Sequence, residues 1–425
     1  MVRLYKYAVW MFVLVLFGCS SSKTNIKLEN NLDVERADEP VVIGRAEVEK
    51  IAGVAASDDM VPSVLLNGKA LPSQVDDLDH DGKWDEFAFL YSFKPKEQVT
   101  LTIKYVKSSE MPVFKQRTNV RLGVGNKKEG FKGVDHAFSP KGFQGKPLRY
   151  QSESVAWEND KMAFRNYFDI RNAKDLFGKL TEDMILDNVG AKGNYHQLND
   201  WGMDVLHVGA SLGSGGLALC QNDSLYRLGS TDVFEFTLVS KGPVRSIFDL
   251  DYKGWHVENK DLEAKERVTI WGGHYWFKSD VTVKGANPES TLAVGIVTSY
   301  LKTPTSLEKM GHFVMGSTLD KQSENKDNLG MGILIPTKEF VKSANAPEAT
   351  VYPLGSPEFA KNRYRKAVTE TFYLTQKLSS QPSTHYFFAV WEEENKKWAS
   401  HDTFKEMMKA ESERIAHPIA ITYNK

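Results

Sequence analysis

The chain has few cysteines and no surplus of charge of either sign, and these absences exclude several classes of protein. Only two cysteines, Cys19 and Cys220, occur in 425 residues, so a scaffold held by several disulfides is excluded. The hydrophobic content of 41% is enough for a sizeable core. Because 54 basic residues are balanced by 55 acidic ones and no long basic run occurs, we expect no nucleic-acid partner.

Four familiar metal-binding or nucleotide-binding patterns are also missing. The sequence has no His-Glu-x-x-His zinc helix and no cysteine pair spaced for a metal. Its glycine-rich stretch, residues 209–216, has neither the lysine of a phosphate-binding loop nor the spacing of a dinucleotide fingerprint. Candidate chemistry must therefore come from dispersed polar side chains.

The first nineteen residues predict a bacterial lipoprotein signal. Arg3 and Lys6 precede an apolar run, residues 8–17, and then come Gly18 and Cys19. Ten apolar residues are too few to span a bilayer as a mature helix. We expect Cys19 to carry lipid in the outer or inner membrane. The periplasmic face is favoured over the cell surface because no acidic run follows, and an uncleaved anchor is the alternative.

Most of the remaining chain reads as strands. Apolar and polar side chains alternate over residues 162–170, 233–239 and 244–252, which is typical of half-buried strands. Short turns between such runs favour an antiparallel sandwich over βαβ units. One C-terminal helix is predicted after a Ser400 cap, and a weaker helical stretch covers residues 356–361.

A basic, irregular connector at residues 115–118 indicates a domain boundary. We expect a small β-sandwich domain before it and a large antiparallel β-supersandwich, the catalytic domain, after it, so that the chain is all-β. The expected segments are a signal at 1–19, a tether at 20–39, the small domain at 40–112 and the large domain at 120–425.

The sharpest local motif is an acidic loop in the small domain. Oxygen side chains stand at its positions 1, 3, 5 and 9 with Gly82 at position 6, which is typical of calcium loops, although Ala88 replaces the usual glutamate at position 12. We expect a structural Ca²⁺ here; the alternative is an acidic turn that caps its own backbone. The candidate ligands are Asp77, Asp79, Asp81 and Asp85.

A second constellation lies at residues 195–209, where aromatic and hydrogen-bonding side chains are dense. Sugar sites need this mixture, because rings stack on apolar sugar faces while polar groups bind hydroxyls. The alternative is a tight loop rich in buried polar bonds. The candidates are Tyr195, His196, Asp200, Trp201, Asp204 and His207.

A third is the polar stripe of one strand, with Arg165 and Tyr167 on the same face. Arginine can clamp a carboxylate, and a tyrosine whose pKa is lowered by a positive neighbour can act as acid or base. A solvated strand face has the same pattern. Further candidates for substrate binding are Glu158, His136 and His274.

Four of these segments together resemble a family of bacterial lipoproteins and secreted proteins from polysaccharide-utilising bacteria. They are residues 74–86, 157–171, 195–216 and 242–245. The family includes the ulvan oligosaccharide dehydratase, and the resemblance covers roughly residues 40–425. It implies elimination of water across C4–C5 of a non-reducing-end uronic acid in an ulvan-type oligosaccharide. By analogy, the large domain is similar to galactose-mutarotase-like supersandwiches.

Such an elimination needs a neutralised carboxylate, a base for the C5 proton and an acid for the departing hydroxyl, and it requires no cofactor. We expect Arg165 to neutralise the carboxylate, with Tyr167, His196 and His207 as the catalytic proton carriers. Asp200 or Asp204 would orient a histidine, and Trp201 would stack on the sugar.

Three other functions remain open. A polysaccharide lyase uses the same chemistry with a glycosidic leaving group. A glycoside hydrolase needs two paired carboxylates, for which Glu158 and Asp204 are the candidates. A non-catalytic carbohydrate-binding lipoprotein needs only the aromatic surface. The oligomeric state is not indicated by any pattern in the sequence.

Overall fold

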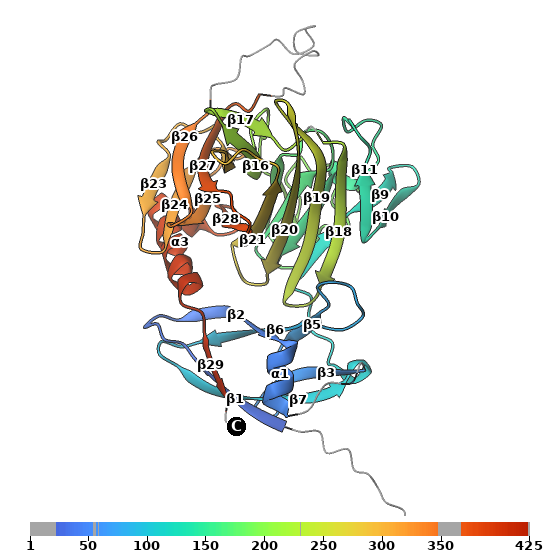
Figure 1. Ribbon diagram of the computed structural model, residues 1–425, viewed down its shortest axis with the longest axis vertical. Coiled ribbons are helices and arrows are strands. Elements are labelled where there is room, and N and C mark those ends of the chain that lie inside the picture. Colours follow the sequence, from blue (N-terminus) through green and yellow to red (C-terminus); the bar gives the residue numbers. More distant parts are fainter. Residues whose placement is uncertain (1–22, 54–56, 58, 230, 347–366, 424–425) are drawn as a thin grey trace, which may run out of the picture.

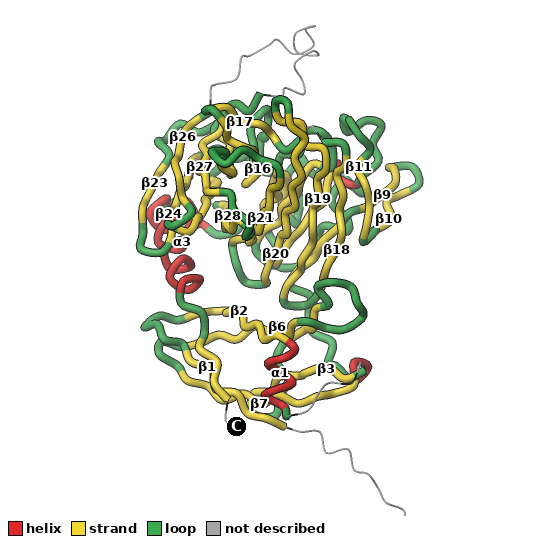
Figure 2. The backbone as a smooth tube through the Cα atoms, viewed as in Figure 1, coloured by secondary structure: helices red, strands yellow, loops and turns green. Residues whose placement is uncertain are grey.

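The computed structural model describes residues 23–53, 57, 59–229, 231–346 and 367–423 (Figure 1). Antiparallel strands dominate, and helices are few: α1 lies in a small domain and α3 lies beside the larger body (Figure 2). Within the described residues, no helix has both the length and the apolar character needed to cross a bilayer. The expected signal, Cys19 and the weak helix at 356–361 lie outside the described residues.

The small domain is a β-sandwich at one end of the molecule (Figure 1). Five strands in the order β29-β1-β7-β3-β4 face three in the order β2-β6-β5, and α1 packs beside them. The elements are β1 (Lys23–Glu29), β2 (Arg36–Gly44), α1 (Arg45–Ala52), β3 (Met60–Leu66), β4 (Lys69–Ala70), β5 (Ser73–Asp76), β6 (Glu86–Phe93), β7 (Gln98–Lys107), η1 (Ser108–Glu110) and β29 (Ala420–Tyr423).

The expected tether at 20–39 is wrong for its described part. β1 pairs along β7 and also with the C-terminal strand β29, and its Ile26 and Leu28 are fully buried. Only two apolar side chains in alternation mark this strand, and its partners lie far along the chain. The small domain therefore includes residues 23–39 as well as the expected 40–112, and the C-terminal strand β29 completes its sheet.

The body is the predicted supersandwich of antiparallel sheets. Its main sheet has the order β11-β18-β19-β20-β21-β28-β25-β24-β23. Two shorter sheets, β15-β14-β13-β12-β8 and β17-β16-β22-β27-β26, are joined by a bridge between Lys174 and Gly213 and pack on it, with β10-β9 as a hairpin at one side. Trp157 and Phe164 of one layer contact Phe277 of the other.

The body strands run from β8 (Thr118–Arg121) to β28 (Ser383–Trp391). Between them lie β9 (Gly123–Asn126), β10 (Gly130–Gly133), β11 (His136–Ser139), η2 (Gln151–Glu153), β12 (Ser154–Asn159), β13 (Met162–Tyr167), β14 (Lys174–Lys179), β15 (Gly202–Asp204), β16 (Ser214–Gln221), β17 (Ser224–Arg227), β18 (Val233–Lys241), β19 (Arg245–Val257), β20 (Lys260–Trp271), β21 (Trp276–Lys284), β22 (Thr291–Val297), β23 (Ser306–Lys309), β24 (Phe313–Asp320), β25 (Leu329–Pro336), β26 (Phe340–Asn345) and β27 (Thr371–Lys377).

The predicted C-terminal helix is present as α3 (His401–Ala416), after the short turn η3 (Lys396–Ala399). The Ser400 hydroxyl accepts the Thr403 N–H, as expected of an N-cap. Phe404 and Met408 are buried, and the helix packs on β24 and β25. At its other end the buried Arg36 of the small domain donates to the carbonyls of Arg414 and His417, which satisfies groups that helix ends leave open.

Two segments that carry the family resemblance meet at the domain interface. The Gln74 side chain accepts the backbone N–H groups of Val244 and Arg245. The Arg245 guanidinium, nearly buried, donates to Asp76 and Glu86. The segments 74–86 and 242–245 therefore form one docking contact between the small domain and the body.

A buried ion pair forms a second interface contact. His274 is 4% exposed, with Nδ1 3.3 Å from Glu411 of α3 and Nε2 2.9 Å from the Asp38 carbonyl oxygen. Burial works against the imidazolium, but Glu411 raises the His274 pKa above its ordinary value. Burial likewise opposes ionisation of Glu411, yet His274 and Arg414 lower its pKa to about 2.

Glu411→Gln should lower the free energy of unfolding by about 3 kcal/mol near pH 6, because it leaves a buried imidazolium unpaired. The stabilisation that the Glu411 carboxylate contributes is present above its pKa in the unfolded chain and is lost as the pH falls toward about 2, its pKa in the folded protein. The His274 contribution is present below its unfolded pKa and is lost as the pH rises through its raised folded pKa. Urea unfolding at several pH values measures both.

Glu413→Gln is the matched control on the same helix, because the Glu413 carboxylate is 54% exposed. That variant should unfold almost like the wild type. Equal unfolding free energies for the two variants across the pH range would contradict the assignment.

Candidate functional site

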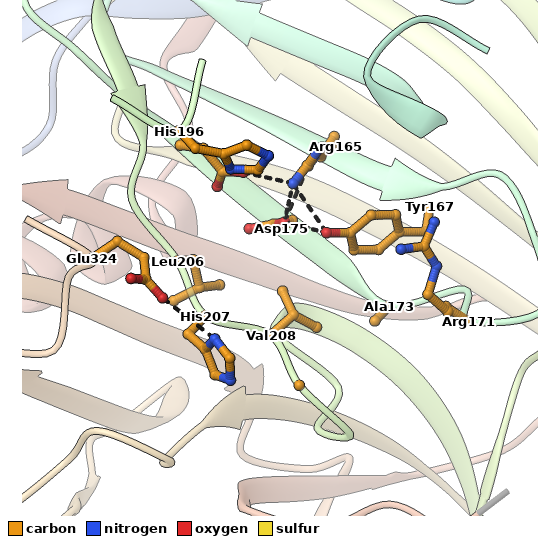
Figure 3. A pocket seen from close by; sticks show the side chains of 12 residues that line it. Arg165, Tyr167, Arg171, Ala173, Asp175, His196, Leu206, His207, Val208 and Glu324 are labelled. Atoms are coloured by element: carbon orange, nitrogen blue, oxygen red, sulfur yellow. Dashed lines mark hydrogen bonds and ion pairs between the residues drawn. The ribbon is translucent and has the colours of Figure 1, made fainter. Parts of the chain in front are cut away.

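One cavity of about 530 Å³ opens on the body and gathers five of the predicted residues. Figure 3 shows it from close by. Arg165 and Tyr167 come from β13, Asp175 from β14, His196 from the loop before β15, and His207 and Glu324 from the opposite side. The lining residues are Arg165, Tyr167, Arg171, Ala173, Asp175, His196, Asp204, Leu206, His207, Val208, Gly209 and Glu324.

Strand alternation and pairing place Arg165 at the centre of one wall. Its neighbour Phe164 points into the core, so Arg165 and Tyr167 share the cavity face, and β-pairing sets Asp175 directly opposite Arg165. Arg165 Nη2 lies 2.5 Å from Asp175 Oδ2 and 2.7 Å from Asp204 Oδ2. The guanidinium thus joins two carboxylates from neighbouring strands.

Arg165 has no donor left for a substrate carboxylate. Its side chain is 2% exposed. Nε donates to Asp175, and Nη1 donates to the Ser152 carbonyl at 3.0 Å and to the Tyr195 hydroxyl at 3.5 Å. Nη2 donates to both carboxylates and to the Tyr167 hydroxyl at 3.0 Å. The expected role of Arg165 as the neutraliser of a substrate carboxylate is therefore corrected. Arg165 is a positioning residue in the wall.

Tyr167 holds its proton. Its hydroxyl donates to Asp175 Oδ2 at 2.8 Å and accepts from Arg165. Burial raises its pKa well above the ordinary value, and Arg165 offsets only part of that shift. The expected lowering of the pKa of this tyrosine is wrong, because the sequence showed the positive neighbour but not the burial. The phenol is a proton donor at neutral pH.

The two wall carboxylates differ in their environment. Burial raises the pKa of Asp175 to about 6, against the lowering effect of Arg165. Asp204 is 3% exposed, and its Oδ2 contacts Arg165 and His196, whereas its Oδ1 has no hydrogen-bond partner. This oxygen is closed to solvent, so the group that Asp204 offers the cavity is the His196 imidazole that it holds.

His196 is held by Asp204. Nδ1 of the imidazole lies 3.1 Å from Asp204 Oδ2, and its side chain is 62% exposed. The contact with Asp204 raises the His196 pKa above its ordinary value. Because Nδ1 faces the carboxylate, Nε2 is the nitrogen left for a substrate proton. The expectation that Asp204 orients a histidine agrees with this geometry.

His207 faces this group from the opposite side of the cavity (Figure 3). Its Nδ1 lies 3.3 Å from Glu324 Oε1, and its ring stacks on Tyr300 with the centroids 5.1 Å apart. The two predicted histidines are therefore both at the cavity, each beside a carboxylate, but on different walls.

Arg171 is a second cation at the cavity, and it has unused donors. Its Nε and Nη2 contact Asp169, and Nη2 also contacts Glu153 at 3.0 Å. No contact of Nη1 is found within the described part of the chain. The guanidinium carbon lies 3.8 Å from the centroid of the Tyr167 ring, and the side chain is 28% exposed. Arg171 is placed to donate to an anion in the cavity.

Three of the six candidates from the 195–209 constellation lie outside the cavity lining. Tyr195 sits behind it, with its hydroxyl 3.5 Å from Arg165 Nη1. The Trp201 ring packs edge-on against Phe177 with the centroids 6.2 Å apart, so it does not present a stacking face to the cavity. Asp200 is exposed and does not contact either histidine.

Three other candidates lie elsewhere. Glu158 is fully buried and accepts from Lys179, Asn119 and the backbone of residues 185–186, so it holds a loop. His136, on the edge strand β11, pairs with Glu235 of the neighbouring strand β18. His274 belongs to the domain interface. Their expected roles in substrate binding are corrected, because buried structural and catalytic polar residues look alike in sequence.

Sequence reasoning missed Asp175, Glu324 and a role for Arg171. Asp175 is recognisable only once β14 is paired with β13, and Glu324 comes from a distant loop.

Residues 209–213 also fit a Gly-x-Ser-x-Gly pattern. Its Ser211 is fully buried and donates to the Val208 carbonyl at 2.6 Å, so it forms a turn and is not a nucleophile.

The acidic loop of the small domain caps its own backbone, as the alternative interpretation held. Asp77, Asp79 and Asp85 accept the N–H groups of Gly82, Asp81 and Leu78. Oxygens of these three carboxylates still lie within 4.8 Å of one another, and Asp77 Oδ1 has no hydrogen-bond partner among the described residues. Asp81 is outside this group and caps the Lys83 N–H. Hard oxygen donors at this spacing fit Ca²⁺.

Comparison with known proteins places the chain in a family. Residues 28–421 match the family described as a domain of unknown function (DUF4861), and the chain belongs to it. It is 25% identical over 290 residues to "Uncharacterized protein P7" of Formosa agariphila. That match covers 64% of this chain and 66% of the relative, so about a third of the relative lies outside it.

Two solved structures from Enterococcus faecalis have a similar trace over 95% of this chain. One is an alpha-mannosidase from strain V583, with 9% identity and a TM-score of 0.46, and the other is a protein in the glycosyl hydrolase family 38, with 10% identity and a TM-score of 0.47. The chain spans about half their length, 46% and 48%.

The acidic loop yields a test. If Asp77, Asp79 and Asp85 bind Ca²⁺, a free concentration about 100 times the dissociation constant should add about 2.7 kcal/mol to the free energy of unfolding. Asp79→Asn should remove the calcium effect, whereas Asp81→Asn, outside the cluster, should keep it. Thermal unfolding with Ca²⁺ or with a chelator measures this, and identical curves would exclude a calcium site.

Proposed function

We propose that this protein is an oligosaccharide dehydratase, a carbon–oxygen lyase, that eliminates water across C4–C5 of a non-reducing-end uronic acid in ulvan-type oligosaccharides. The observation that carries the proposal is the cavity itself. It combines a carboxylate-oriented imidazole, a half-buried phenol that keeps its proton and an arginine with unused donors. These are the three groups that elimination beside a carboxylate needs.

In this scheme Arg171 binds the uronate carboxylate and stabilises the charge that develops when C5 loses its proton. His196 takes that proton on Nε2 while Asp204 holds Nδ1. Tyr167 donates to the departing C4 hydroxyl, and Arg165, 3.0 Å from its oxygen, stabilises the resulting phenolate.

His207 is the second candidate for the proton donor. It stands opposite His196, whereas Tyr167 shares the wall of His196 (Figure 3). A donor on the same wall implies removal of proton and hydroxyl from one face of the sugar, and a donor on the opposite wall implies removal from two faces. The variants described below separate the two assignments.

A glycoside hydrolase is less well supported. Glu158, one of its two candidate carboxylates, is buried beside Lys179 and is not a lining residue of the cavity. A polysaccharide lyase would use the same residues with a sugar as the leaving group, so only the products separate it from a dehydratase. We also propose that Cys19 anchors the chain by lipid at the periplasmic face.

The test of this function is to supply a saturated uronic-acid-terminated oligosaccharide and to follow ultraviolet absorbance from the conjugated product. We expect absorbance to rise with loss of one water and no shortening of the chain, as mass spectrometry would show. His196→Ala and Tyr167→Phe should each lower kcat by at least about 100-fold, the usual contribution of a positioned acid or base.

His136→Ala is the control, because His136 lies outside the cavity beside Glu235. If the Tyr167→Phe variant keeps a near-normal kcat and the His207→Ala variant loses most of its kcat, His207 is the proton donor. Shortened chains would indicate a lyase or hydrolase, and binding without any product would indicate a non-catalytic protein.

The pH dependence gives a separate test of the base. Asp204 raises the His196 pKa, so activity should rise with pH through a value above 6.5 as the imidazole loses its proton. Asp204→Asn should shift that limb to lower pH and lower kcat. Profiles of kcat/KM for both enzymes measure the shift, and an unchanged limb would remove His196 as the base.

A further inference from the structure

The loop at residues 322–328 is firmly anchored beside the cavity. Gln322 and Ser323 are buried, and Gln322 donates to the Leu329 carbonyl. The Asp327 carboxylate accepts from Ser323 and from Trp391 Nε1, the latter at 2.7 Å. These contacts fix the side of the loop that faces the core, so the side chains on its outer side start from a rigid backbone.

The outer side of this loop presents Glu324 and Lys326 next to His207. Lys326 has a φ of 65°, a conformation that non-glycine residues rarely adopt. Its ammonium lies 4.6 Å from the centroid of the Tyr300 ring. Tyr300 in turn stacks on His207, and Glu324 lies 3.3 Å from both the Tyr300 hydroxyl and His207 Nδ1.

Lys326 differs from the arginines of the cavity because its charge is not paired with a carboxylate of the described residues. Arg165 and Arg171 are each paired with two carboxylates. In the described part of the chain, by contrast, no carboxylate lies within 4.0 Å of the exposed Lys326 ammonium. Glu324, the nearest acidic residue in sequence, is already engaged by His207 and Tyr300. Lys326 is thus held over an aromatic ring with donors to spare.

We infer that Tyr300 and Lys326 form a second subsite, which binds an anionic substituent on the sugar next to the reacting uronic acid. This inference rests on the proposed function and adds a substrate requirement to it. From His207 at the cavity, one side-chain contact reaches Tyr300 and a second reaches Lys326. Together these two contacts cover about the length of one further sugar. The ammonium takes a sulfate ester or a second carboxylate, and Tyr300 contributes ring surface.

The test uses three disaccharides that share a non-reducing-end uronate. Their second sugar carries a sulfate ester, a carboxylate or neither. At low salt, we expect the KM of the wild type for the neutral disaccharide to be about fivefold higher than its KM for at least one of the two anionic disaccharides. A fivefold difference is the scale of an exposed ion pair. Added salt should reduce the difference. The two anionic substrates identify which anion is preferred.

Lys326→Met should abolish the preference by raising KM for the anionic substrate alone, with kcat unchanged, and Lys326→Arg should retain it. Lys321→Met is the matched control on the same segment, since Lys321 faces Glu392. Calorimetric binding of the three disaccharides to wild type is measured in parallel. If wild type shows no turnover but binds an anionic disaccharide more tightly than the neutral one, and Lys326→Met removes that preference, only the proposed function is refuted. Turnover with no preference, or with a preference that Lys326→Met keeps, would overturn the subsite.

Discussion

The candidate site depends on one buried cation, Arg165, held between two carboxylates. Removing a guanidinium from water costs several kcal/mol, which only close, hydrogen-bonded partners offset. Asp175 and Asp204 supply that compensation at 2.5 and 2.7 Å. Each carboxylate also makes a second contact, since Asp175 accepts from the Tyr167 phenol and Asp204 holds the His196 imidazole. The same charge network therefore orients both the proposed acid and the proposed base.

This arrangement explains why Arg165 is poorly suited to the role that its position in the sequence indicated. An arginine that binds substrate must have donors exposed to the cavity, whereas Arg165 donates to protein groups with every nitrogen. Four residues after Tyr167, past the end of β13, lies the partly exposed Arg171, whose Nη1 has no partner in the described part of the chain. The residues of the polar stripe do come together at the cavity, but the different environments of Arg165 and Arg171 follow from burial, which the sequence does not show.

Local pattern was enough for much of the fold. Alternation predicted the strands of the body, and the Ser400 cap predicted the start of α3. Pairing between distant segments was not predictable, which is why β1 was taken for a tether. The same limit affects the site. His196, His207 and Asp204 were found from their density in one segment, whereas Asp175 is set opposite Arg165 by the pairing of β13 with β14, and Glu324 reaches the cavity from a loop far along the chain.

The small domain contributes no lining residue to the cavity, yet it contacts the strands that build it. Arg117, just before β8, pairs with Asp38 of the small domain and with Asp160 at the end of β12. Glu158 on β12 then binds the backbone N–H groups of residues 185–186, at the start of the long excursion that delivers His196. These links are charge-assisted hydrogen bonds, and they connect the small domain to the sheet that positions the base. The sequence segments that carry the family resemblance include the docking contact through Arg245 as well as the cavity.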